Sequence, residues 1–113
     1  MRRFLYFEAD GDGTAALAVP VERVAGIDVT SATEFGIFFD SIGAVGVGAD
    51  GNSGSVEFTN VTSGDMKAVV EAIADAMLHS TDPFIVVLDA QNAEKIHSSM
   101  STTAGHVTIT LDD

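Results

Sequence analysis

The fold is decided by the stretch MKAVVEAIADAMLHSTDPFIVVLD, residues 66–89. Its first half repeats apolar side chains at the spacing of one helix face, namely Met66, Val69, Val70, Ile73 and Met77. Thr62 and Asp65 have the spacing of a capping box, so we expect the helix to begin near residue 63. It should end near His79, because the Asp82-Pro83 pair disfavours continuation.

The second half of this stretch, residues 84–89, is a continuous apolar run, which is typical of a buried central strand. Apolar and alternating patterns predict further strands at residues 3–8, 15–21, 23–29, 34–39, 55–60 and 106–111. Pro20 cannot donate to a ladder, so its strand should end there or lie at a sheet edge. Residues 90–105 are polar and are expected to be irregular.

These elements predict an α+β fold, with a mostly antiparallel sheet and one amphipathic helix, about residues 63–79, packed on a face. A β-sandwich that carries one helix is the alternative. If strands 55–60 and 84–89 are parallel neighbours, the crossover through the helix should be right-handed. The length of 113 residues suits a single domain, residues 1–113, and 46% of them are hydrophobic.

The charge of the chain is strongly negative, with 17 acidic residues, 5 basic residues and a formal net charge of -12. Nucleic acids and anionic membranes are bound mainly by basic side chains, so neither is expected as a partner. The sequence contains no cysteine, which excludes disulfides, thiolate metal sites and a cysteine nucleophile.

A glycine-rich stretch, residues 42–55, is predicted to be a mobile hairpin loop. Within it, Gly46–Gly51 matches the glycine pattern of dinucleotide-binding loops. That motif needs a helix N-terminus directly after the glycines to hold the pyrophosphate, whereas a predicted strand follows here. We therefore expect no nucleotide, and the sequence indicates no other cofactor.

The acidic turn near the N-terminus is the candidate metal site. Glu8, Asp10 and Asp12 have the spacing of the first ligands of a calcium loop. The final bidentate ligand of such a loop should fall at residue 19, which is Val19, and no helix is predicted on either side. A structural turn is one reading, and a small cation- or ligand-binding module that uses residues 8–14 is the alternative function.

No catalytic arrangement is evident. The three histidines, His79, His97 and His106, are scattered without the spacing of metal ligands. The many carboxylates are explained by a solvated acidic surface. We expect a non-enzymatic protein, and the alternative is an enzyme subunit whose site forms only between chains.

The beginning of the chain has a faint resemblance to a signal peptide, since Arg2 and Arg3 precede the apolar residues Phe4–Phe7. That run stops at Glu8 and is too short for the apolar region of a signal peptide. No stretch reaches transmembrane length. We expect neither a signal peptide nor a transmembrane segment.

Several segments in a fixed order carry a resemblance to known proteins. They are VPVERVAGI at residues 19–27, SAT at 31–33, the strand at 35–39, SVEFT at 55–59 and KAVVEAI at 67–73. In this order they resemble small structural or uncharacterised virion proteins of marine tailed phages, cyanophages especially. The resemblance covers most of the chain and implies a capsid decoration, cement or tail-associated role, in the virion or in the cytoplasm of the infected host. It brings no catalytic residues.

Self-association is the last expectation from the sequence. Residues 4–7 and 35–39 are apolar on both faces of their strands, and one helix can cover only one face of a small sheet. The other face must be buried by a second layer or by another copy of the chain. We expect a homo-oligomer that tightens as salt screens the like charges.

Overall fold

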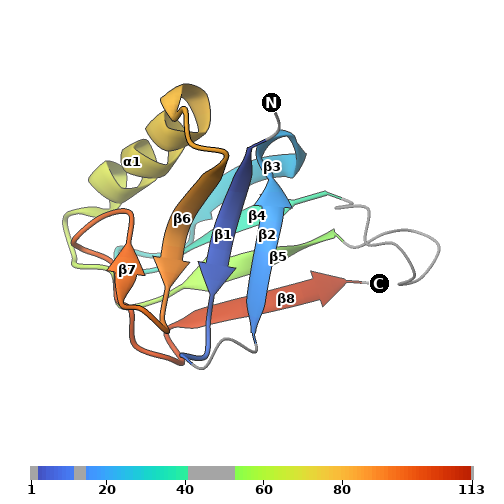
Figure 1. Ribbon diagram of the computed structural model, residues 1–113. Coiled ribbons are helices and arrows are strands. Elements are labelled where there is room, and N and C mark those ends of the chain that lie inside the picture. The colour runs from blue at the N-terminus through green and yellow to red at the C-terminus, as the bar shows by residue number, and fades with distance from the viewer. Residues whose placement is uncertain (1–2, 12–14, 41–52, 113) are drawn as a thin grey trace.

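The computed structural model describes residues 3–11, 15–40 and 53–112, which form two four-stranded sheets and one α-helix (Figure 1). The first sheet has the strand order β2-β1-β6-β7, and its strands are Ala16–Pro20, Phe4–Glu8, Phe84–Asp89 and Glu94–Lys95. The second sheet has the order β3-β4-β5-β8, with strands Val24–Val29, Phe35–Phe39, Ser53–Phe58 and Val107–Asp112. The α+β class is confirmed, and the two sheets are also compatible with the sandwich alternative.

In the first sheet, β1 lies between β2, which is antiparallel to it, and β6, which is parallel to it. The two-residue strand β7 pairs with the end of β6, so β6 is a central strand, as its apolar run predicts. Pro20 is the last residue of β2, which is an edge strand. This placement agrees with the missing backbone donor of proline.

The second sheet is antiparallel throughout. Its strand β5 begins at Ser53, so the last residues of the glycine-rich stretch belong to a strand and not to a loop. The rest of that stretch, with its predicted mobility, lies outside the described residues. Strands β5 and β6 belong to different sheets, so they are not parallel neighbours and the expectation about their crossover does not apply.

The hydrophobic core lies between the sheets, whose strands cross steeply in Figure 1. Three phenylalanine rings join the layers. Phe35 and Phe58 of the second sheet stack with ring centroids 4.7 Å apart, and Phe7 of β1 lies 6.0 Å from Phe58. Other buried inner-face residues are Leu5, Val19, Ile37, Phe39, Val56, Ile85, Val87, Leu88 and Val107.

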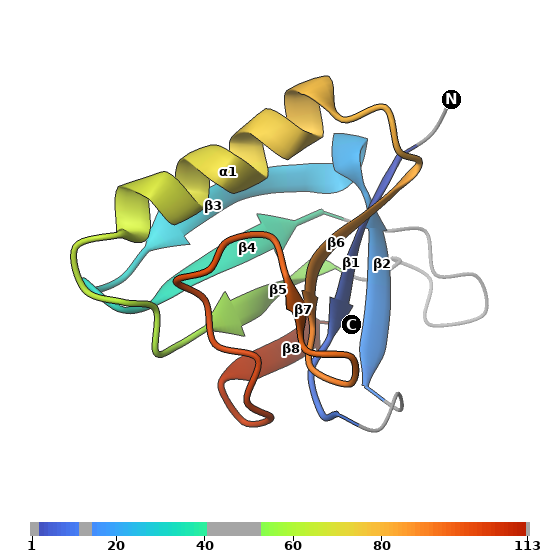
Figure 2. The same cartoon turned by 60° about the vertical axis from the view of Figure 1, so that its left-hand side comes forward.

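The helix α1, Met66–His79, runs alongside β3 (Figure 2). Of the predicted apolar face, Met66, Val69 and Ile73 are buried, while Val70 and Met77 are half-buried. At the other end, Arg3 Nη1 donates to the carbonyl oxygens of Ala76 and Ser80, at 3.4 and 3.1 Å. Arg3 therefore satisfies two acceptors at the helix C-terminus.

The predicted capping box is wrong, because the helix begins at Met66 and not near residue 63. Gly64 has a φ of +93°, and the Asp65 N–H donates to the Thr62 carbonyl oxygen, so a turn precedes the helix. Asp65 occupies the N-cap position without a side-chain cap. Its Oδ2 accepts a 2.7 Å hydrogen bond from the Ser99 hydroxyl instead.

The segment between β6 and β8 is irregular, as its polar composition predicts, apart from the two-residue strand β7. The Thr62 N–H donates to the Ser99 carbonyl oxygen, and Lys95 Nζ donates to the Met100 carbonyl oxygen at 2.9 Å. Met100 is buried in the core. The segment is thus fixed to the start of α1 by contacts distant in sequence, which local patterns do not reveal. In the part of the chain that the structure describes, no helix is both long and apolar enough to cross a membrane.

Candidate functional site

The outer side of the first sheet is an apolar surface. Alternation along β1 directs Leu5 and Phe7 into the core, so Phe4, Tyr6 and Glu8 lie on the opposite face of the strand. We call the uncharged part of this outer surface the aromatic face; its members are Phe4, Tyr6, Ala16, Ala18, Phe84 and Val86, and the buried carboxylates of Glu8 and Asp89 lie at its end. Within it, the ring centroids of Tyr6 and Phe84 lie 4.9 Å apart, and the Phe84 side chain is 50% exposed. These side chains make this part of the outer surface apolar.

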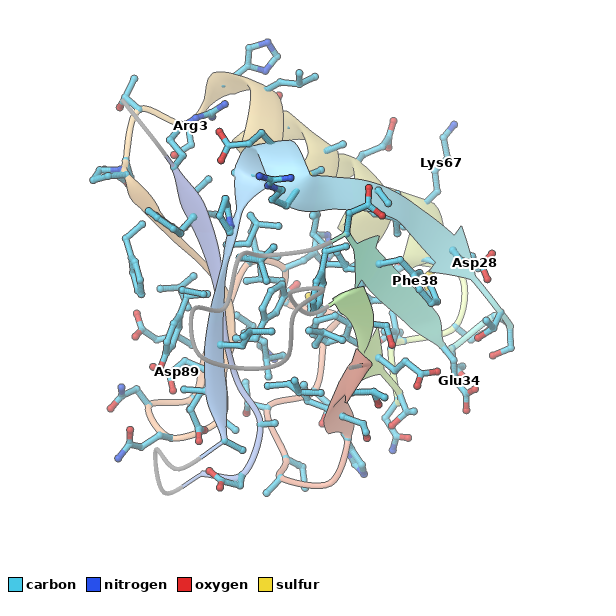
Figure 3. All side chains as sticks on the ribbon, turned by 90° about the vertical axis from the view of Figure 1, so that its right-hand side faces the viewer. Arg3, Asp28, Glu34, Phe38, Lys67 and Asp89 are labelled. Carbon is cyan, nitrogen blue, oxygen red and sulfur yellow. The ribbon has the colours of Figure 1, made fainter. Side chains whose placement is uncertain are left out.

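The outer side of the second sheet differs in character. Gly36 of β4 is flanked across the sheet by Asp28 and Glu57, which are exposed, so this surface carries charge. The exposed Phe38 has a local explanation, because a Cβ added at Gly36 would lie 3.1 Å from Phe38 Cε1. The Phe38 ring therefore covers the glycine of its own strand. Figure 3 shows Phe38 and Asp28 on this side of the molecule.

Tyr6 gives the aromatic face a polar group. Burial raises the pKa of the Tyr6 phenol above its ordinary value of 10.0, and the negative charges of Asp89 and then Glu8 raise it further. The phenol is therefore neutral at physiological pH. The negative charges that act on it, those of Asp89 and Glu8, lie at the end of the aromatic face.

The raised pKa of Tyr6 gives a pH prediction. Tyr6 is the sole tyrosine of the chain, so an ultraviolet absorbance titration reports this group alone. We expect a midpoint above 10.0 in the folded protein and a smaller elevation of the pKa in Asp89→Asn, in which burial remains. Because the folded pKa is raised, the stabilisation is complete below pH 10.0 and is lost as the pH rises through the folded pKa. A midpoint at or below 10.0 in the folded protein would contradict this arrangement.

Two buried carboxylates lie at the carboxyl ends of the parallel strands β1 and β6, where Glu8 is paired in register with Asp89. The Glu8 carboxylate accepts hydrogen bonds from the N–H groups of Asp10 and Gly11, at 3.3 and 2.9 Å. Asp89 accepts from the N–H groups of Gln91 and Asn92 and from the Asn92 side-chain amide. Each carboxylate thus organises the turn that follows its own strand.

The predicted metal site is only partly within the described residues, because Asp12 lies outside them. Glu8 and Asp10 are adjacent in the turn, where the Glu8 carboxylate accepts the Asp10 N–H. Gly11 has a φ of +82°, which agrees with the interpretation of this segment as a structural turn. Across residues 3–11, 15–40 and 53–112, no cluster of three or more His, Asp or Glu side chains could hold a metal ion.

The three histidines do not form a common site, because each ring has a different hydrogen-bond partner. His79 Nδ1 lies 2.8 Å from Asp75 Oδ1 on the exposed side of α1, and His97 Nδ1 accepts the Ser99 N–H. His106 Nδ1 lies 2.7 Å from Ser101 Oγ, a pair that sequence spacing does not reveal. Among the described residues no carboxylate is hydrogen-bonded to His106, so the orienting third group of a serine–histidine triad is missing there.

A second apolar feature is an open pocket of about 560 Å³ between α1 and β3. One wall is formed by residues 24–27 of β3 and by Val21 of the short 3₁₀ helix η1, Val21–Arg23. The opposite wall is formed by Ala74, Met77 and Leu78 of α1, and Arg3 completes the lining.

Comparisons of the chain with protein-family models, with curated proteins and with solved structures found no match. The features of this chain that bear on its function are its two apolar surfaces and the residues that line them.

Proposed function

We propose that this chain is a non-enzymatic structural subunit that associates with copies of itself through the aromatic face. The resemblance to small virion proteins of marine tailed phages favours a place in a phage particle, as a decoration, cement or tail-associated component. Genes for capsid, portal or tail proteins beside the gene of this chain would support that setting. A neighbourhood of metabolic genes would count against it.

The observation that carries the proposal is that Phe4, Tyr6, Ala18, Phe84 and Val86 form an uncharged area on a chain whose formal net charge is -12, with the buried carboxylates of Glu8 and Asp89 at its end. Copies with so much like charge repel each other, and they can approach most closely where neither copy presents a charged side chain. Ala16 and Ala18 on the edge strand β2 are small, so the backbones of two copies can come close there. The surface is also self-complementary in chemistry, as a two-fold interface requires.

The energy balance favours association when salt is present. Burial of apolar surface contributes roughly 25 cal/mol per Å², and Phe84 alone exposes half of its surface. Repulsion between the acidic surfaces is screened beyond about 8–10 Å at physiological ionic strength. Because salt weakens the repulsion and leaves the apolar contact intact, association should strengthen as the salt concentration rises.

The experiment is size exclusion with light scattering at low and high salt, on the wild type and on two matched aspartate variants. We expect a mass above that of the monomer for the wild type, with a larger oligomeric fraction at high salt. Phe84→Asp places a charge on the aromatic face and should yield monomers. Phe38→Asp adds the same charge to the outer side of the second sheet and should leave the oligomer intact.

Two results would contradict the proposal. The first is a strictly monomeric wild type at micromolar concentration in both buffers, which would indicate that the second sheet alone is the layer that buries the apolar strands. The second is an equal loss of oligomer in both variants, which would place the interface elsewhere.

A further inference from the structure

The pocket between α1 and β3 exists because small residues face each other across it. Ala25 and Gly26 on β3 and Ala74 on α1 leave space that the larger residues of the lining do not fill. Its volume of about 560 Å³ falls within the range of about 300–1,000 Å³ that is usual for small-molecule sites. Apart from Arg3, its lining is apolar. The pocket therefore suits a ligand with an aliphatic body.

Arg3 adds a fixed positive charge to this apolar lining. Its Nη1 is held by the carbonyl oxygens of Ala76 and Ser80, so the guanidinium is positioned by the last turn of α1. An arginine has five N–H donors in a planar fork, and the hydrogen bonds to α1 use one of its three nitrogens. In the described part of the chain no carboxylate forms an ion pair with Arg3. Donors remain for an anionic group in the pocket.

We propose that this pocket binds an aliphatic monocarboxylate of the medium-chain fatty acid class. The alkyl chain lies between Met77 of α1 and Val24 and Ile27 of β3, and the carboxylate pairs with the Arg3 guanidinium. The negative charge of the whole chain opposes any anion, but salt screens that field beyond about 8–10 Å. The Arg3 charge acts at contact distance and outweighs it.

The test is isothermal titration calorimetry of the full chain with two probes of equal alkyl length, decanoate and the uncharged 1-decanol. We expect saturable binding of decanoate and at least about tenfold weaker binding of decanol, because an ionic hydrogen bond is the difference between them. Arg3→Gln should weaken the binding of decanoate by at least about tenfold and leave the binding of decanol unchanged. Lys67→Gln makes the same change of charge at the other end of α1 and should have no effect; Figure 3 shows Arg3 and Lys67 well apart.

Ala74→Phe fills the pocket without removing Arg3 and should abolish the binding of both probes. Thermal unfolding will show whether Arg3→Gln folds. If it does not, Ala74→Phe and the comparison of the two probes still test whether the pocket binds a carboxylate. The absence of saturable decanoate binding would overturn the proposal, as would unchanged binding in Ala74→Phe. Equal affinity for the two probes would indicate a neutral lipid and would also overturn it.

Discussion

Replacing Phe58 with alanine is expected to lower the free energy of unfolding by about 3–5 kcal/mol. Phe58 is fully buried in β5, stacks on Phe35 within the second sheet and contacts Phe7 of the first sheet. The loss combines the transfer of a large apolar side chain to water with a cavity at the junction of the two sheets. It is a large part of the 5–15 kcal/mol that is typical of whole domains.

The measurement is chemical denaturation followed by circular dichroism, at one low protein concentration, because association would add to the apparent stability. Phe58→Leu is the matched control, since it retains much of the apolar volume and should lose clearly less than the alanine variant. If Phe58→Ala lost under 1 kcal/mol with an unchanged slope, the three-ring cluster would not be the junction that holds the sheets together.

The strands and the helix could be predicted because their patterns are local. The continuous apolar run at residues 84–89 indicated a strand covered on both sides, and β6 is central in the first sheet. The helical repeat located α1, and the apolar side chains that it selected include the buried Val69 and Ile73. These signals depend on the spacing of side chains along one element, which a single sequence displays.

The assembly of those elements could not be predicted in the same way. The division of the strands between two sheets and the parallel pairing of β1 with β6 depend on contacts between distant segments. The capping-box spacing of Thr62 and Asp65 predicts too early a start for α1, because it ignores Gly64, whose positive φ belongs to the turn before the helix. The Asp65 carboxylate then binds Ser99, a partner 34 positions away.

The candidate surfaces show the same limit. The sequence indicated that residues 4–7 are apolar on both faces, and the structure assigns Leu5 and Phe7 to the core and Phe4 and Tyr6 to the aromatic face. The pocket had no comparable signal, because Arg3 meets α1 across more than 70 positions of the chain. Only the small residues that line it could have been noted in advance, and small residues alone do not indicate a pocket.

Replacing Ile73 with alanine is the second large effect that we expect, a loss of about 2–5 kcal/mol in the free energy of unfolding. Ile73 is fully buried in the middle of α1 and belongs to the same core cluster as the inner faces of both sheets. Alanine is the best helix former, so the loss cannot come from helix propensity and must come from the lost burial of apolar groups and the cavity that they leave. Chemical denaturation under the conditions used for Phe58→Ala measures it.

Leu78→Ala is the matched control on the same helix, because Leu78 is 73% exposed and should change the stability by no more than about 0.5 kcal/mol. A large difference between the two variants would establish that α1 is part of the core and does not merely cover β3. A loss below 1 kcal/mol in Ile73→Ala would instead mean that the two sheets are stable without the helix. In that case the pocket beside β3 would be bounded by an element that can detach, and ligand binding there would have to stabilise the helix as well.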